Sequence, residues 1–123
     1  MKILIADDNQ EVRLILKSLI EKIILPNQNT SFSDAESADE AISRLRRGEE
    51  YDAVIIDYDM PANGEGLAVV AITRERLPKA RIALMSGRMD VEIGNLAAHA
   101  GADVALSKPA NAQQWSEFLT GPH

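Results

Sequence analysis

The chain has 123 residues, a formal net charge of −6 and 46% hydrophobic residues, which is typical of one globular domain rather than a disordered chain. The acidic balance disfavours a nucleic-acid-binding surface, which needs clustered Lys and Arg. The absence of cysteine excludes disulfides, thiolate metal sites and cysteine nucleophiles. No apolar run reaches the roughly 18 residues of a membrane span, and the N-terminus does not resemble a signal peptide, so we expect a cytoplasmic protein without membrane contact.

The first predicted element is a buried strand at residues 3–6, where the sequence is continuously apolar. An amphipathic helix over residues 12–23 follows, with one apolar face that includes Ile15 and Ile23, and Pro26 ends it. Residues 30–35 alternate between apolar and polar side chains and predict a weaker strand at a sheet edge. The next helix covers residues 38–45, with a capping-box pattern at Ser37 and Glu40.

Two further strand and helix pairs follow Gly48, which ends the preceding helix. We expect strands at residues 53–56 and 82–85 and helices at residues 67–74 and 93–100. A last strand at residues 104–106 precedes a short helix at residues 115–119, in which Trp115 is expected to pack against the sheet. Continuously apolar strands indicate a parallel sheet covered on both faces, and the strict alternation of five strands with five helices predicts a doubly wound α/β fold.

Polar side chains follow the predicted strands at the points where those strands end. Asp7 and Asp8 follow the first strand, Asp57 closes the third, Ser86 closes the fourth and Lys108 follows the fifth. In isolation, an aspartate here can cap a helix or form a turn, the serine can form a turn, and the lysine can lie in solvent. In a doubly wound sheet, however, ligands bind beyond the carboxyl ends of the strands. The combination therefore predicts one functional cleft.

The residue types in this cleft favour phosphoryl transfer. Three crowded carboxylates repel one another unless a cation is present, and oxygen ligands without His or Cys favour Mg²⁺. A lysine and a hydroxyl opposite the carboxylates make sense if an anion must bind there as well. Phosphoryl transfer needs this pairing, because cations neutralise the phosphoryl oxygens while a nucleophile is held in line.

The motifs "ILIADDN", "AVIIDYDMP", "ALMSG" and "ALSKPA" lie at residues 3–9, 53–61, 83–87 and 105–110. In this order and spacing, they closely resemble the receiver domain of two-component response regulators. The resemblance implies a flavodoxin-like strand order, 2-1-3-4-5. It covers essentially the whole chain, which begins at the first predicted strand and ends after the last predicted helix, so we expect residues 1–123 to be a single receiver domain.

The resemblance also implies roles in a phosphorelay. Asp57 would accept a phosphoryl group from a histidine kinase or a histidine phosphotransfer protein. Asp8, Asp57 and the backbone carbonyl of Asp59 would bind Mg²⁺, with Asp7 contributing through water. A receiver dephosphorylates itself and signals through phosphorylation-controlled protein contacts, so it is not a turnover enzyme. The sequence does not identify the downstream target protein.

Further roles implied by the resemblance concern the phosphoryl group itself. Ser86 would donate a hydrogen bond to it, Gly87 would leave room for it and offer a backbone N–H, and Lys108 would pair with one of its oxygens. The peptide bond between Lys108 and Pro109 is expected to be cis. Arg88 and Asp59 would border the pocket, and an ion pair between them is expected to hinder attacking water and lengthen the phosphorylated lifetime.

Two positions depart from the family pattern. Receivers carry Tyr or Phe three positions before the lysine, where this chain has Ala105. We therefore expect the output to depend on movement of the loop after Ser86 or of the fourth helix. The segment after Pro61, "ANGEG", is one residue longer than the common pattern, which would alter the loop that faces the kinase.

Two other functions compete with this interpretation. Ala105 favours a receiver-fold binding module that acts without phosphorylation, although the crowded carboxylates argue against it. The sequence "IIDYDMP" also resembles the strand end of haloacid-dehalogenase-like phosphatases. Those enzymes place the acidic motifs in the reverse order and need additional substrate-binding segments, which this length barely permits.

Overall fold

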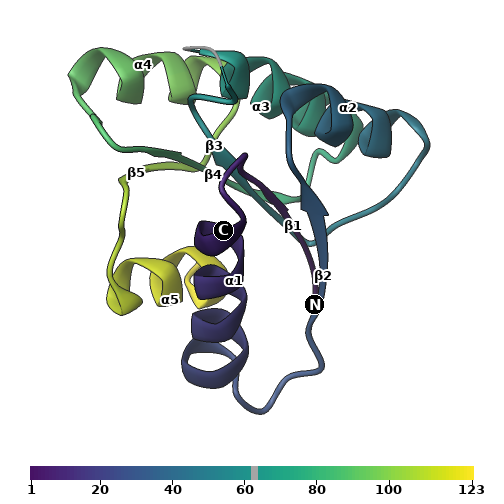
Figure 1. The fold of residues 1–123 in the computed structure, drawn as a ribbon, viewed down its shortest axis with the longest axis vertical. Helices are drawn as coiled ribbons and strands as arrows, with labels where there is room; N and C mark the ends of the chain where they lie inside the picture. The colour runs from purple at the N-terminus through teal and green to yellow at the C-terminus, as the bar shows by residue number, and fades with distance from the viewer. Residues whose placement is uncertain (62–63) are drawn as a thin grey trace.

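The computed structural model describes residues 1–61 and 64–123 and has a parallel sheet between two layers of helices (Figure 1). The elements in chain order are β1 (Lys2–Ala6), α1 (Gln10–Leu19), the π-helical turn η1 (Ile20–Ile24), β2 (Ser31–Ala35), α2 (Ala38–Arg46), β3 (Ala53–Asp57), α3 (Glu65–Arg76), β4 (Arg81–Ser86), α4 (Val91–Ala100), β5 (Val104–Ser107) and α5 (Ala112–Thr120). The doubly wound α/β fold is therefore confirmed. None of the helices described in these two ranges is long and apolar enough to cross a bilayer.

The strand order is β2-β1-β3-β4-β5, as the resemblance implied, and every neighbouring pair is parallel. Strand β1 lies between β2 and β3, so that Ala6 pairs with both Ala35 and Ile56. The chain reverses its direction of travel across the sheet at β1, which is where ligands bind in folds of this kind. The carboxyl ends of β1 and β3 therefore lie side by side at the expected functional edge.

Helices α2, α3 and α4 cover one face of the sheet, and α1 and α5 cover the other (Figure 1). Alternate strand residues point to opposite faces, so Leu4 and Ile56 pack on the first side and Ile5 and Ile55 on the second. Trp115 is 1% exposed and meets the Phe118 ring edge to face at 6.1 Å between centroids. It belongs to the second cluster, in agreement with its predicted packing.

The helix predicted over residues 12–23 differs from the observed one. Helix α1 ends at Leu19, and a π-helical turn continues it, closed by a 2.8 Å hydrogen bond from the Leu25 amide to the Ile20 carbonyl. Ile15 and Ile23, which were assigned to the apolar face, are 67% and 64% exposed. The buried stripe of α1 is narrower than its apolar stripe. Part of the buried face is formed by Arg13, which is 4% exposed.

The predicted capping box of α2 is only half formed. The Ser37 side chain accepts a hydrogen bond from the Glu40 amide, but the Glu40 carboxylate accepts from the Glu36 amide instead of from Ser37. A complete capping box, which the sequence interpretation did not identify, joins Asn111 and Gln114 at the start of α5.

Candidate functional site

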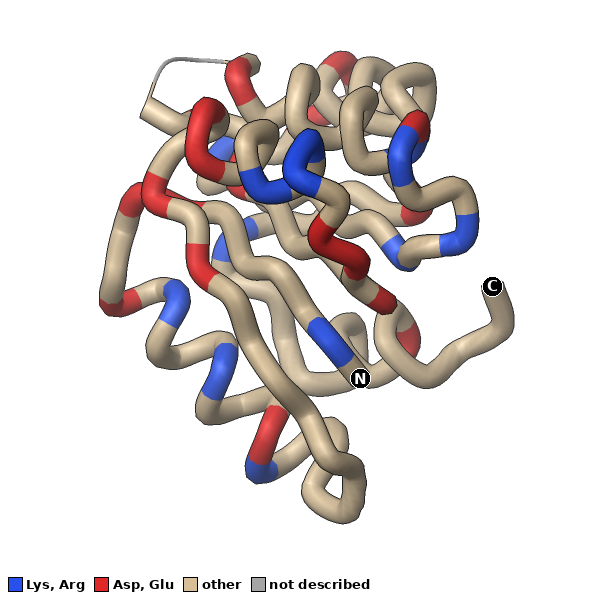
Figure 2. The backbone as a smooth tube through the Cα atoms, turned by 90° about the vertical axis from the view of Figure 1, so that its right-hand side faces the viewer, with Lys and Arg blue, Asp and Glu red and all other residues tan. Residues whose placement is uncertain are grey.

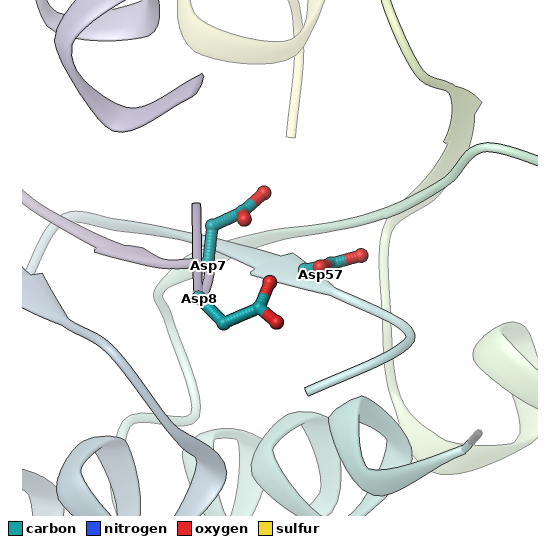
Figure 3. A group of neighbouring side chains, drawn as sticks. All are labelled: Asp7, Asp8 and Asp57. Atoms are coloured by element: carbon teal, nitrogen blue, oxygen red, sulfur yellow. The ribbon is translucent and has the colours of Figure 1, made fainter. Parts of the chain in front are cut away.

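Three aspartates come together at the carboxyl ends of β1 and β3. Asp7 and Asp8 follow β1, Asp57 is the last residue of β3, and one carboxylate oxygen from each lies within 4.8 Å of the others (Figure 3). Asp7 is fully buried and Asp57 is 4% exposed, whereas Asp8 is exposed. The cluster is therefore closed on the protein side and open to solvent at Asp8.

Asp7 is held at both its backbone and its side chain. Its amide donates to the Ala35 carbonyl at 3.0 Å, which ties the end of β1 to β2. Its Oδ1 accepts from the Asn9 amide at 2.8 Å, and its Oδ2 lies 2.7 Å from Lys108 Nζ. The side chain of Asn9, and not that of Asp8, caps α1, because it accepts from the amides of the first turn. Asp8 is therefore available to a ligand.

Lys108 connects the far end of the sheet to the acidic cluster. Its amide donates to the Ser86 carbonyl at 2.9 Å, and its Nζ lies 3.4 Å from Asp57 Oδ2 in addition to its contact with Asp7. Burial lowers the pKa of this lysine, but the hydrogen bond to Asp7 and the charge of Asp57 outweigh burial and raise it above its ordinary value. A charged ammonium group therefore lies between two buried carboxylates.

The Asp57 carboxyl has a pKa above its ordinary value. Burial and, to a smaller extent, the charge of Asp7 raise its pKa to about 6, although the nearby Lys108 acts in the opposite direction. One of its oxygens accepts from the Asp59 amide at 3.3 Å. One lysine therefore does not compensate for the negative charge of this cluster, which favours binding of a further cation.

This donor set fits a hard divalent cation such as Mg²⁺, because all three clustered groups are carboxylates and one is exposed to solvent. Asp59 is not part of that cluster, and its Oδ1 lies 4.0 Å from Arg88 Nη2. Its side chain is thus directed to Arg88, which leaves the backbone carbonyl as the predicted ligand. The Arg88 guanidinium also lies 5.9 Å from the centre of the Tyr58 ring.

The remaining predicted positions surround this cluster. Ser86 is fully buried at the end of β4, and its Oγ accepts from the Arg88 amide at 3.2 Å. A Cβ at Gly87 would meet nothing within 4 Å, so the space beside it is open. The peptide bond between Lys108 and Pro109 is cis. Ala105 packs against the core on the side of α2, α3 and α4.

The lengthened loop predicted after Pro61 lies partly outside the described residues, because Ala62 and Asn63 are not described. Beyond it, Gly64 adopts a left-handed conformation with φ of 83°, and α3 begins at Glu65.

The sequence interpretation missed two residues that shape the site. A Cβ on Gly66 would lie 2.2 Å from the Asp57 carbonyl oxygen, so only glycine allows α3 to pack this closely on the end of β3. A glycine immediately before the helix predicted at residues 67–74 was the available signal. Arg13 is 4% exposed on α1, and its guanidinium donates to the Asp7 carbonyl. Its sequence pattern gave no signal, because an arginine on an amphipathic helix ordinarily faces solvent.

A family model for the response regulator receiver domain matches residues 3–120. The photosynthetic apparatus regulatory protein RegA of Rhodobacter capsulatus is 32% identical over 117 residues, covering 95% of this chain and 59% of RegA. The chain thus spans about three-fifths of the length of that curated relative.

Solved structures with the same fold include two response regulators. A receiver domain protein from Clostridium thermocellum is 26% identical with a TM-score of 0.79, covering 96% of this chain and 90% of that one. A response regulator from Burkholderia pseudomallei, with a phosphorylated aspartic acid, a calcium ion and citrate, is 25% identical with a TM-score of 0.78. That match covers 97% of this chain and 66% of the other.

Proposed function

Because the chain belongs to the response regulator receiver domain family, we propose that Asp57 accepts a phosphoryl group from the phosphohistidine of a histidine kinase or a histidine phosphotransfer protein. The observation that carries this proposal is the position of Lys108 Nζ, which lies 2.7 Å from Asp7 and 3.4 Å from Asp57 in a cluster of three carboxylates. An acidic cluster with a lysine across it suits a phosphoryl group accompanied by a cation.

In the proposed reaction, a carboxylate oxygen of Asp57 forms the new bond to phosphorus. The bond between phosphorus and the imidazole nitrogen breaks, and its electron pair stays on that nitrogen. Asp57 must be ionised to attack, and its pKa of about 6 means that the ionised form predominates at neutral pH. The Asp59 amide orients one of its oxygens. Water later attacks the phosphorus, restores the carboxylate and releases inorganic phosphate.

Other residues bind and neutralise the transferred group in this proposal. Lys108 would shift its contact from the carboxylates to a phosphoryl oxygen, and the Ser86 hydroxyl and Gly87 amide would donate hydrogen bonds to the others. Asp7, Asp8, Asp57 and the Asp59 carbonyl would hold Mg²⁺. That ion supplies positive charge to the phosphoryl oxygens and favours the ionised form of Asp57.

The proposed output is a phosphorylation-controlled protein contact in the cytoplasm, rather than turnover of an external substrate. The Arg88 amide donates to Ser86 Oγ, so a phosphoryl group that recruits the Ser86 hydroxyl would disturb the loop leading into α4. This route does not require an aromatic residue at Ala105. If substitution of Arg88 and Asp90 left the affinity for a binding protein unchanged in both phosphorylation states, this output route would be wrong.

The decisive experiment is phosphorylation by acetyl phosphate or phosphoramidate, followed by intact mass, with and without Mg²⁺. We expect one phosphoryl adduct that requires Mg²⁺ and is lost in Asp57→Ala. The matched control is Asp52→Ala, which removes an exposed carboxylate that precedes β3 and is expected to retain the adduct. No adduct in the unsubstituted protein would instead favour a binding module that acts without phosphorylation. Repeated turnover of a small phosphate ester would indicate a phosphatase.

A further inference from the structure

Arg13 is a buried cation that the proposed phosphoryl chemistry does not use. It projects from the first half of α1, is 4% exposed, and carries a charge that must be compensated inside the protein. Its Nε donates to Asp34 Oδ2 at 2.9 Å, and its Nη2 lies 3.5 Å from Glu36 Oε1. Both acids lie at the end of β2. Figure 2 shows acidic positions gathered at this end of the sheet, with basic positions on the helix beside them.

The third contact of Arg13 is with the backbone between Asp7 and Asp8, two of the residues proposed to hold Mg²⁺. Its Nη1 donates to the backbone carbonyl of Asp7, and this hydrogen bond is buried. That carbonyl belongs to the peptide group that joins Asp7 to Asp8. The Asp7 amide is fixed on the opposite side by the Ala35 carbonyl at 3.0 Å. The chain at both aspartates is therefore held by two hydrogen bonds, one to the Ala35 carbonyl and one from the Arg13 guanidinium.

Asp8 depends most on this arrangement. The Asp7 side chain has its own supports in the Asn9 amide and Lys108. Asp8 is exposed, and it reaches the cluster by virtue of the direction in which the backbone leaves β1. A rotation of the peptide group between the two aspartates would turn the Asp8 carboxylate away from Asp57.

We propose that Arg13 is a positioning residue for the divalent cation site, in which its guanidinium fixes the peptide group between Asp7 and Asp8. Arg13 does not touch the cation or the phosphoryl group, and it acts through the backbone carbonyl of Asp7. This inference rests on the proposed function, because it takes the acidic cluster to be a cation site. Outer groups that orient ligands typically change metal affinity by roughly 10- to 100-fold when they are removed.

The test measures binding of Mn²⁺ by electron paramagnetic resonance of the free ion, with Mg²⁺ as competitor and without a phosphoryl donor. Arg13→Met keeps the length and apolar contacts of the side chain and removes its donors. We expect it to weaken binding by about 10-fold or more, as for other orienting groups. Arg13→Lys retains the charge and one donating group, and we expect a smaller loss.

The matched control is Asp34→Asn. It weakens the ion pair with Arg13 but leaves the hydrogen bond from Arg13 to the Asp7 carbonyl in place. We expect it to lower stability in urea while its Mn²⁺ affinity stays within about 3-fold of the unsubstituted protein, short of the losses typical for ligand-orienting groups. Far-UV circular dichroism checks that each variant is folded. Should Arg13→Met fail to fold, the comparison of Arg13→Lys with Asp34→Asn decides the question.

The outcomes separate this inference from the proposed function. If Arg13→Met binds Mn²⁺ as tightly as the unsubstituted protein does, the positioning role is overturned and the phosphoryl-acceptor proposal stays intact. If only Arg13→Lys folds, the same comparison is made with that variant. An equal loss in the arginine variant and in Asp34→Asn would also overturn it, because the effect would then follow from general destabilisation. An unsubstituted protein that binds no Mn²⁺ would overturn the cation site itself, and the role of Arg13 with it.

Discussion

Replacement of Asp57 by asparagine is expected to stabilise the protein when no divalent cation is present. The folded state raises the pKa of this carboxyl from 3.8 to about 6. At pH values between these two, the folded protein keeps a proton that the unfolded chain has already released. Stability therefore falls as the pH rises between these two values. A shift of roughly two pKa units corresponds to about 3 kcal/mol at neutral pH, and Asn keeps the shape of the side chain without its charge.

The assay is urea denaturation in EDTA, followed by far-UV circular dichroism at pH 7.5 and at pH 4.5. We expect Asp57→Asn to gain about 1 to 3 kcal/mol at the higher pH and much less at the lower one. Glu50→Gln is the control, because it makes the same change of net charge at an exposed position. A gain that is absent at pH 7.5, or equal at both pH values, would refute the argument that burial of the Asp57 charge, together with repulsion from Asp7, destabilises the site.

Three further predictions concern the same edge of the sheet. Gly66→Ala should destabilise the fold by about 3 kcal/mol in urea denaturation, because its Cβ would lie 2.2 Å from the Asp57 carbonyl oxygen. Gly94→Ala is the control and should not destabilise the fold by this mechanism, because a Cβ there meets nothing within 4 Å. Mg²⁺ at about ten times its dissociation constant should raise the free energy of unfolding by about 1.4 kcal/mol, and Asp8→Asn should lose this gain in thermal melts. Arg88→Ala should shorten the phosphorylated lifetime, measured by intact mass over time. Equal decay rates would show that the pair with Asp59 does not hinder water.

The elements of the fold were predictable from local patterns, because continuously apolar runs distinguish strands in a parallel sheet from amphipathic helices. The predicted strands agree with β1, β3, β4 and β5 to within one residue at each end. The strand order was not contained in those patterns and came from the resemblance. The meeting of Asp7 and Asp57 was predictable once the sheet was taken as parallel, since adjacent parallel strands end at the same edge.

The errors have a common physical origin in contacts between distant residues. The pattern placed Ile15 inside and gave no reason to bury Arg13, whose principal ion pair is with Asp34, 21 positions away. Hydrophobic periodicity predicts which face of a helix is apolar. Whether a cationic side chain is buried depends instead on whether another element supplies a carboxylate to pair with it. The need for glycine at position 66 likewise arises only when α3 meets the end of β3. By contrast, the capping box at Asn111 was readable from the sequence and was overlooked.

The contact between Lys108 and Asp7 joins residues 101 positions apart. A chain emerging from the ribosome would display Asp7, Asp8 and Asp57 long before the lysine that lies between them. The acidic residues alone would therefore be exposed to the cell without the ammonium group that completes the pocket. The proposed acceptor site is therefore complete only once β5 has joined the sheet, because the residue that follows this strand supplies its ammonium group.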